Sequence, residues 1–97
     1  MELKFSKTFK RSFERQISYI AKDKPRFAAE FRNEVLTVLK RAAKNPELNR
    51  ISRFTNRTNC RDVIYKGHTI VVRVTEKFLE ILDIIYMQSF SEEDFEN

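Results

Sequence analysis

Five residues in the second half of the chain could act together on a phosphate ester, namely Arg61, Tyr65, His68, Arg73 and Tyr86. Arginine side chains stabilise the negative charge that develops as a phosphodiester is cleaved, and a tyrosine or histidine can transfer the proton. Such a set could cleave RNA without a metal ion, and its candidate catalytic residues are Arg61, Arg73, Tyr86 and His68. Sequence does not establish that they share a surface, because strand faces are ambiguous after each turn.

A second basic group precedes this set, in a stretch from residue 47 to residue 59 that has no regular hydrophobic period. Guanidinium groups bind phosphates or carboxylates through two parallel hydrogen bonds, and Phe54 could stack on a base. The stretch is equally consistent with a solvated connector whose Phe54 packs on the core. The candidate residues for binding a nucleic acid or another target are Arg50, Arg53, Arg57, Arg61 and Arg73.

Several other kinds of site are excluded because the residue types that they need occur only once in the chain. Gly67 is the only glycine, so no glycine-rich phosphate loop can form. Cys60 and His68 are each the only residue of their type, which excludes a Cys/His zinc cluster and an internal disulfide. His68 follows Gly67, and we expect it to lie exposed in a turn without a catalytic role, so a serine or cysteine triad is not expected. We predict no metal and no small-molecule cofactor.

Length and charge limit the class of protein. The 97 residues predict a single domain over residues 1–97. The net charge is +5, yet the last 20 residues hold six acidic residues and no Lys or Arg, so an acidic tail follows a basic body. Such a body attracts nucleic acid or an acidic protein, although many of its cations could simply solvate helix faces. The single cysteine and the lack of an apolar leader or span predict a cytoplasmic protein that does not enter a membrane.

The first half of the chain predicts a short strand and two helices. Leu3 and Phe5 alternate with polar residues, and Ser6 is a good N-cap for the first helix. A second helix starts at Pro25 and ends before Asn45-Pro46, which makes an antiparallel hairpin. The apolar stripes predicted to face a sheet are Phe9, Phe13, Ile17, Ile20 and Ala21, then Phe27, Phe31, Val35, Val38, Leu39 and Ala42.

Residues 60–86 predict three strands in a meander, interrupted at residues 66–68 and 75–77. In the middle strand Ile70, Val72 and Val74 point to one face, and the opposite face carries Thr69 and Arg73. That open face is the first candidate site. The last strand, residues 78–87, is apolar on both sides and is predicted to be the most buried. Ser91 and the acidic residues after it predict the start of a short C-terminal helix, and a frayed terminus is equally consistent with them.

The order of these elements resembles the RelE/ParE superfamily of bacterial type II toxins. The resemblance runs over about residues 3 to 89 and depends on residues 5–9, 17–21 and 28–39, on Asn45-Pro46, and above all on residues 61–63, 69–74 and 80–86. It implies an α+β fold in which an N-terminal helical hairpin packs on a small, mainly antiparallel sheet in the order β-α-α-β-β-β. It also implies a cytoplasmic toxin that inhibits growth, contributes to plasmid stabilization and is neutralised by a cognate antitoxin.

Two branches of the superfamily differ in their target. Members similar to RelE cut mRNA on the ribosome, whereas members similar to ParE poison DNA gyrase. Cutting members commonly carry arginine where this chain has Thr69, basic residues near Gln88 and Ser89, and histidine at Tyr86. These departures favour a ParE-like or catalytically atypical toxin that inhibits its target by binding. The alternatives are a RelE-like ribosome-dependent mRNA endonuclease and an interaction module without toxicity.

Overall fold

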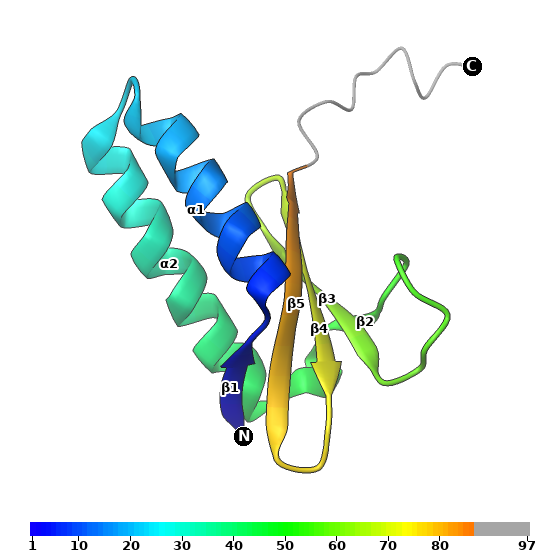
Figure 1. Cartoon of the computed structure of the whole chain (residues 1–97). Coiled ribbons are helices and arrows are strands. Elements are labelled where there is room, and N and C mark those ends of the chain that lie inside the picture. Colours follow the sequence, from blue (N-terminus) through cyan, green and yellow to red (C-terminus); the bar gives the residue numbers. More distant parts are fainter. Residues whose placement is uncertain (87–97) are drawn as a thin grey trace.

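A computed structural model describes residues 1–86. The chain forms β1 (Glu2–Phe5), α1 (Lys7–Ala21), α2 (Pro25–Lys44), a 3-10 turn η1 (Pro46–Leu48), β2 (Arg50–Ile51), β3 (Cys60–Tyr65), β4 (His68–Val74) and β5 (Phe78–Tyr86). The two helices form an antiparallel hairpin on one side of a twisted sheet (Figure 1). The short C-terminal helix predicted to start at Ser91 lies outside the described residues.

The sheet has five strands in the order β1-β5-β4-β3-β2. Strand β1 is parallel to β5, and the other pairs are antiparallel. The predicted α+β class and the meander are therefore confirmed, and β1 lies at an edge as expected. The β-α-α-β-β-β order was incomplete, because it lacked the two-residue strand β2, which is too short to show a period of two.

Local signals set the helix ends. The Ser6 hydroxyl accepts a hydrogen bond from the Phe9 amide at 2.9 Å and donates one to the Leu82 carbonyl at 2.7 Å. It therefore caps α1 and also ties the helix to β5. Pro25 occupies the first turn of α2, where its missing N–H is not needed, and the helix ends at Lys44 before Asn45-Pro46.

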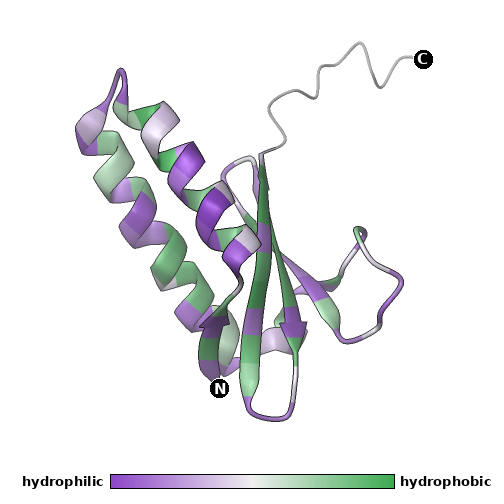
Figure 2. Ribbon diagram, viewed as in Figure 1, coloured by the Kyte–Doolittle hydropathy of each residue, from purple (hydrophilic) through white to green (hydrophobic). Residues whose placement is uncertain are grey.

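The core lies between the helix pair and the sheet, where apolar residues of both layers meet (Figure 2). Its fully buried members include Phe9, Val35, Leu39, Ile70, Val72, Leu79 and Ile81. Phe27 is an exception to the predicted stripe, since 59% of its surface is exposed. It lies in the first turn of α2, near the hairpin loop, and the Lys24 ammonium lies 5.5 Å from its ring centre.

Strand β4, and not β5, is the most buried strand. Residues His68 to Val72 are all buried, whereas β5 alternates between buried and half-buried positions. Strand β4 is the central strand of the five, whereas β5 is covered on its outer side only at residues 78–81, where β1 pairs with it. Of the two β4 residues predicted to meet a ligand on the open face, Thr69 is only 4% exposed and Arg73 is half-buried.

A β-bulge changes the faces of β5. Val71 pairs with Asp83 and Val72 pairs with Ile81, so Leu82 has no partner of its own on β4. Because of this extra residue, even-numbered residues of β5 point toward the helices after the bulge, whereas odd-numbered residues do so before it. Ile84 therefore lies in the core together with Ile81. Tyr86 consequently pairs with His68 and lies on the same face of the sheet as the helices.

No helix within residues 1–86 combines the length and the apolar character needed to cross a membrane. No group of three or more potential metal-ligating residues occurs in that part of the chain either.

Candidate functional site

The proposed catalytic set is divided between the two ends of the sheet. His68 and Tyr86 face each other at the β3–β4 turn, and Arg73 lies near the other end of β4. With a rise of about 3.4 Å per residue, the Cα atoms of His68 and Arg73 are roughly 17 Å apart along the strand. The sequence analysis grouped these residues together. In the structure, the length of β4 separates His68 and Tyr86 from Arg73.

His68 is buried at the turn end of the sheet. It is 5% exposed, and its ring lies 4.5 Å from Tyr86 and 4.8 Å from Phe31, measured between ring centres. The predicted exposed imidazole was therefore wrong. The error arose because the turn contains only Lys66 and Gly67, both with positive φ, so that His68 already belongs to β4.

The histidine is held in a neutral form. Its Nδ1 lies 3.2 Å from the Lys66 carbonyl, and because a carbonyl can only accept, Nδ1 carries the proton. Its Nε2 is buried and has no hydrogen-bond partner within residues 1–86. Burial lowers the pKa of His68 despite the opposing effect of the Lys66 carbonyl. An imidazole in this position contributes packing and is poorly placed to exchange protons with a substrate.

Arg61 and Arg73 lie on opposite faces of the sheet. Arg61 pairs with Val72, which belongs to the helix-facing core, and Arg73 is the next residue along β4. Both guanidinium groups have internal partners, since Arg61 Nη1 donates to the Asn49 carbonyl at 2.8 Å and Arg73 Nε to Glu80 Oε1 at 2.7 Å. The hydrogen bond with Glu80 raises the pKa of Arg73 and lowers that of Glu80.

Residues 50–59, here called the basic loop, carry the remaining candidates. Arg50, Arg53 and Arg57 are exposed, and 45% of the surface of Phe54 is accessible. The Arg53 and Arg57 side chains take part in no ion pair within residues 1–86. Unlike Arg61 and Arg73, these two cations are free to meet a partner.

A buried carboxylate fixes the basic loop to the sheet. Asp62, on β3, is 1% exposed, and its Oδ2 accepts from Arg50 Nε at 3.3 Å and from the Arg53 amide at 3.0 Å. The Ser52 amide also donates to the Cys60 carbonyl at 2.9 Å. Sequence reasoning missed this anchor, although Asp62 is the sole acidic residue between Glu47 and Glu76.

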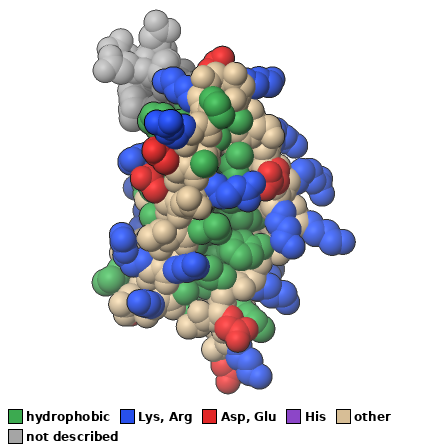
Figure 3. Space-filling view, turned by 90° about the vertical axis from the view of Figure 1, so that its left-hand side faces the viewer, with side chains coloured by type: hydrophobic (Ala, Val, Ile, Leu, Met, Phe, Trp, Pro, Cys, Tyr) green, Lys and Arg blue, Asp and Glu red, His purple; other side chains and the backbone are tan. Residues whose placement is uncertain are grey.

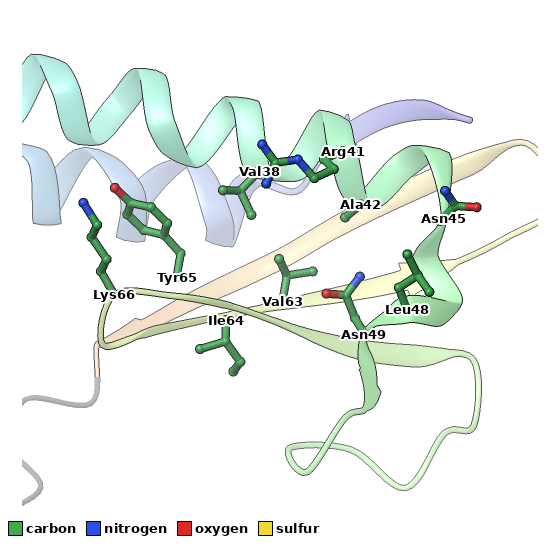
Figure 4. A pocket seen from close by; sticks show the side chains of 10 residues that line it. All are labelled: Val38, Arg41, Ala42, Asn45, Leu48, Asn49, Val63, Ile64, Tyr65 and Lys66. Atoms are coloured by element: carbon green, nitrogen blue, oxygen red, sulfur yellow. The ribbon is translucent and has the colours of Figure 1, made fainter.

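A groove runs along the edge of the sheet beside the basic loop. It has a volume of about 460 Å³ and lies between α2 and β3. Val63 and Tyr65 point from β3 toward α2, and Ile64 points away from it (Figure 4). The groove is lined by Val38, Arg41, Ala42, Asn45, Leu48, Asn49, Val63, Ile64, Tyr65 and Lys66.

The outer side of the helix pair offers a shallower surface. Apolar side chains form a strip along its middle, with Lys and Arg side chains on both sides (Figure 3). A hollow of about 170 Å³ lies there between α1 and α2. The ion pair between Arg32 and Glu14, 2.8 Å long, joins the two helices beside it.

Comparison with known proteins identifies the family. The family model for the ParE toxin of the type II toxin-antitoxin system, parDE, matches residues 3–88. The chain belongs to this family. It is therefore the toxin component of a type II toxin-antitoxin module, as the sequence resemblance implied. No curated protein sequence matches the chain significantly.

The fold agrees with this assignment to the ParE family. A solved structure described as the chromosomal ParDE TA system from P. aeruginosa superposes with a TM-score of 0.72. The match covers 90% of this chain and 96% of the other, at 16% sequence identity. At that identity the likeness concerns the fold, and it confirms the arrangement of a helical hairpin on a small sheet.

Proposed function

We propose that this ParE-family toxin inhibits DNA gyrase by binding it and that a cognate antitoxin prevents this binding. The observation that carries the proposal is the position of the cations. The guanidinium groups of Arg53 and Arg57 are exposed on an anchored loop, whereas Arg61 and Arg73 are engaged internally and lie away from His68. This arrangement suits recognition of a partner better than phosphodiester cleavage.

Cleavage would need a cation and a titratable group on the same scissile phosphate. A donor to the developing charge in comparable sites contributes about 2.7–4 kcal/mol to transition-state stabilisation. In this chain the neutral imidazole is buried at the turn end, and its Nε2 does not reach solvent. The RelE-like endonuclease remains the second candidate, because the Tyr86 side chain is 37% exposed and therefore accessible to a substrate.

A supercoiling assay with purified gyrase tests the first candidate. Micromolar toxin is expected to inhibit supercoiling, and Arg53→Gln/Arg57→Gln is expected to weaken inhibition by about tenfold or more, since two exposed charge contacts are lost. Arg11→Gln/Arg15→Gln on α1 is the matched control, because it removes the same charge from an exposed face elsewhere. Undiminished supercoiling by gyrase at micromolar toxin contradicts the proposal.

Primer extension on translated message after induction separates the two candidates. The gyrase proposal expects intact message. Cuts that disappear in Arg61→Ala would instead establish the endonuclease, and growth that is unaffected by induction would favour an interaction module without toxicity.

The antitoxin is expected to be encoded beside the toxin gene and to be acidic, in keeping with the net charge of +5. Co-expression of the antitoxin should relieve the growth arrest that the toxin causes. The toxin is expected to act in the cytoplasm, where DNA gyrase and ribosomes are found. The polar part of the toxin–antitoxin affinity should fall as salt concentration rises, because exposed charges are screened. An affinity that does not change with salt would show that the arginines are not engaged.

A further inference from the structure

The surface around the basic loop has almost no acidic side chains. Between Glu47 and Glu76 the sequence contains a single acidic residue, Asp62, and its carboxylate is buried and already bonded. The loop extends away from the helix pair beyond the end of β2 (Figure 1). Such a surface attracts a polyanion, because its positive charge is not balanced locally.

Three cations on this surface are available to a ligand. Lys44, Arg53 and Arg57 are exposed, and none of them forms an ion pair within residues 1–86. A guanidinium group binds a phosphate through two parallel hydrogen bonds, and an ammonium binds it as a point charge. The three side chains can therefore hold phosphates without first releasing a carboxylate of their own chain.

Internal hydrogen bonds hold the basic loop in one shape. The Phe54 amide donates to Ser52 Oγ at 3.1 Å, and the Arg57 amide donates to Thr55 Oγ1 at 3.0 Å. At the end of the loop, the Cys60 amide donates to the Arg57 carbonyl at 3.3 Å. A ligand does not have to order this loop, which lowers the entropic cost of binding.

An aromatic ring lies between the two arginines in the sequence of the loop. Phe54 is 45% exposed, and no other ring or cation within residues 1–86 covers it. An exposed ring of this kind stacks on an unpaired base. The bases of a double helix already stack on one another, so Phe54 favours a single strand.

A hollow opens beside the loop, between the end of α2, the start of β3 and the end of β4. Its volume of about 490 Å³ is within the usual range for ligand pockets, about 300–1,000 Å³. Ala43 and Val74 supply apolar surface, Lys44 and Thr58 supply polar groups, and Glu47 is the only acid among the described residues that line it. This mixture suits one nucleotide, whose base is apolar on its faces and whose phosphate is anionic.

We propose that the basic loop and the hollow beside it bind an unpaired strand of nucleic acid. Arg53 and Arg57 hold phosphates, Phe54 stacks on a base, and Lys44 holds the phosphate of a nucleotide in the hollow. The carboxylates of an acidic polypeptide would match the cations alone. Single-stranded DNA and RNA share the required chemistry, and the experiments below distinguish them. The inference goes beyond the proposed function, because the strand is bound without gyrase.

Fluorescence anisotropy of a labelled oligothymidylate of about 12 nucleotides tests the phosphate contacts with the full-length toxin alone. Arg53→Gln/Arg57→Gln should weaken binding at least tenfold. It should also reduce the slope of log affinity against log salt by about 1.4, since each phosphate contact on a single strand contributes about 0.7. Arg11→Gln/Arg15→Gln, which removes the same charge from α1, should bind within about threefold of wild type. Equal losses in the two variants overturn the proposal.

Phe54→Ala tests the preference for an unpaired base. We expect the affinity for oligothymidylate to fall at least fivefold, and the affinity for a duplex of the same length to change less than twofold. Tyr19→Ala, which removes a ring that is 65% exposed on α1, is the matched control and should change neither affinity. A wild-type toxin that binds the duplex more tightly than the single strand contradicts the proposal.

Lys44→Gln tests the hollow. It should weaken binding of oligothymidylate at least threefold, whereas Lys40→Gln, exposed one turn earlier on α2, should leave it unchanged. NMR spectra of the wild-type toxin give an answer even if a variant does not fold. Oligothymidylate should shift the amide signals of Lys44 and of residues 53–59 and leave those of residues 22–24 in place. Shifts confined to the helix pair overturn the proposal.

Two further ligands identify what is recognised. Oligouridylate of the same length shows whether the site prefers RNA or DNA, and tighter binding of either strand supports the site. Polyglutamate of the same charge should compete at least tenfold less well than oligothymidylate, and equal competition overturns the proposal because charge alone would then be recognised. Strand binding without inhibition of gyrase would leave this site and remove the proposed target, and inhibition without strand binding would do the reverse.

Discussion

The two ends of the sheet contain residues that look alike in the sequence and differ in the structure. At the turn end, His68 lies between Phe31 and Tyr86, and no cationic side chain of residues 1–86 is bonded to it. At the other end Arg61 and Arg73 lie on opposite faces, with acceptors from the same chain. Groups suited to catalysis are thus used for packing at one end and for internal ion pairs and hydrogen bonds at the other.

This difference shows which groups are left for a partner. Once the internal bonds are accounted for, the exposed side chains of the basic loop and of Ile64 on β3 remain accessible. Both lie on the β2–β3 side of the sheet. Binding by this toxin is therefore expected to concentrate there, and the following variants test each part of the comparison.

Phe31→Ala should have the largest effect, because it removes the ring that joins both helices to the turn end. Phe31 is 7% exposed and lies within 6.2 Å of the ring centres of Phe13, Tyr65 and His68. We expect the free energy of unfolding, measured in urea, to fall by about 3–5 kcal/mol. Phe27→Ala on the same helix is the control and should change it by less than about 1 kcal/mol, since Phe27 is mostly exposed. Equal losses would show that the turn end is loosely packed.

Asp62→Ala should have the next largest effect, at the other end of the comparison. The substitution leaves the Arg53 amide without its acceptor and frees Arg50, so we expect a loss of about 1–3 kcal/mol in unfolding free energy. Trypsin should also cleave faster after Arg53 and Arg57, because the basic loop loses its anchor. Asp23→Ala, in the exposed hairpin loop, is the matched control. Unchanged cleavage would show that the anchor lies elsewhere.

The pH dependence of stability separates a packed histidine from a catalytic one. The folded protein lowers the pKa of His68 below its ordinary value of about 6.5. The unfolded chain then binds the proton more readily, so the stabilisation is complete above pH 6.5 and is lost as the pH falls below it. The change in unfolding free energy that His68 causes cannot exceed about 1.4 kcal/mol per pH unit. The charged residues that line the hollow next to His68 are Glu30, Glu34 and Lys66.

His68→Phe keeps the stacked ring and removes the proton, and it serves as the control for this titration. Between pH 7.5 and pH 5, wild type should lose more unfolding free energy than the variant. Parallel curves for the two proteins would mean that the imidazole is not desolvated in the fold.

Arg73→Gln should have the smallest effect on stability. The side chains of Arg73 and Glu80 are 33% and 21% exposed, and exposed ion pairs contribute little. The hydrogen bond nevertheless lowers the pKa of the Glu80 carboxyl, so its contribution is present above the ordinary pKa and is lost as the pH falls. In Arg73→Gln an NMR titration should show the pKa of Glu80 returning toward its ordinary value, while the melting temperature changes little. A large fall in melting temperature would contradict this interpretation.

The parts of the fold that local chemistry determines could be predicted. Ser6, Pro25 and Asn45-Pro46 each act within one helical turn, and the helices begin and end where they indicate. The bulge at Leu82 could not be predicted, because it depends on how two strands meet and not on either alone. Without the bulge, Tyr86 would lie on the face of the sheet that points away from the helices, so the sequence alone could not place it relative to His68.

The surroundings of the candidate residues could be predicted only in part. The exposure of Arg50, Arg53 and Arg57 agrees with the sequence expectation, because an irregular polar stretch stays at the surface. The role of Asp62 and the burial of His68 depend on residues far away in the chain, and side-chain type alone gave the opposite expectation for His68. The contributions of Arg50, Arg53 and Arg57 to target binding and toxicity remain predictions.

The pairing of the first strand with the last has a consequence for synthesis of the toxin. Strand β1 has β5 as its neighbour, and the Ser6 hydroxyl bonds to a carbonyl 76 residues later. The N-terminal strand therefore waits without a partner until almost the whole chain has left the ribosome. A nascent or truncated polypeptide that lacks β5 cannot complete the sheet, so translation must nearly finish before the cell holds a folded toxin.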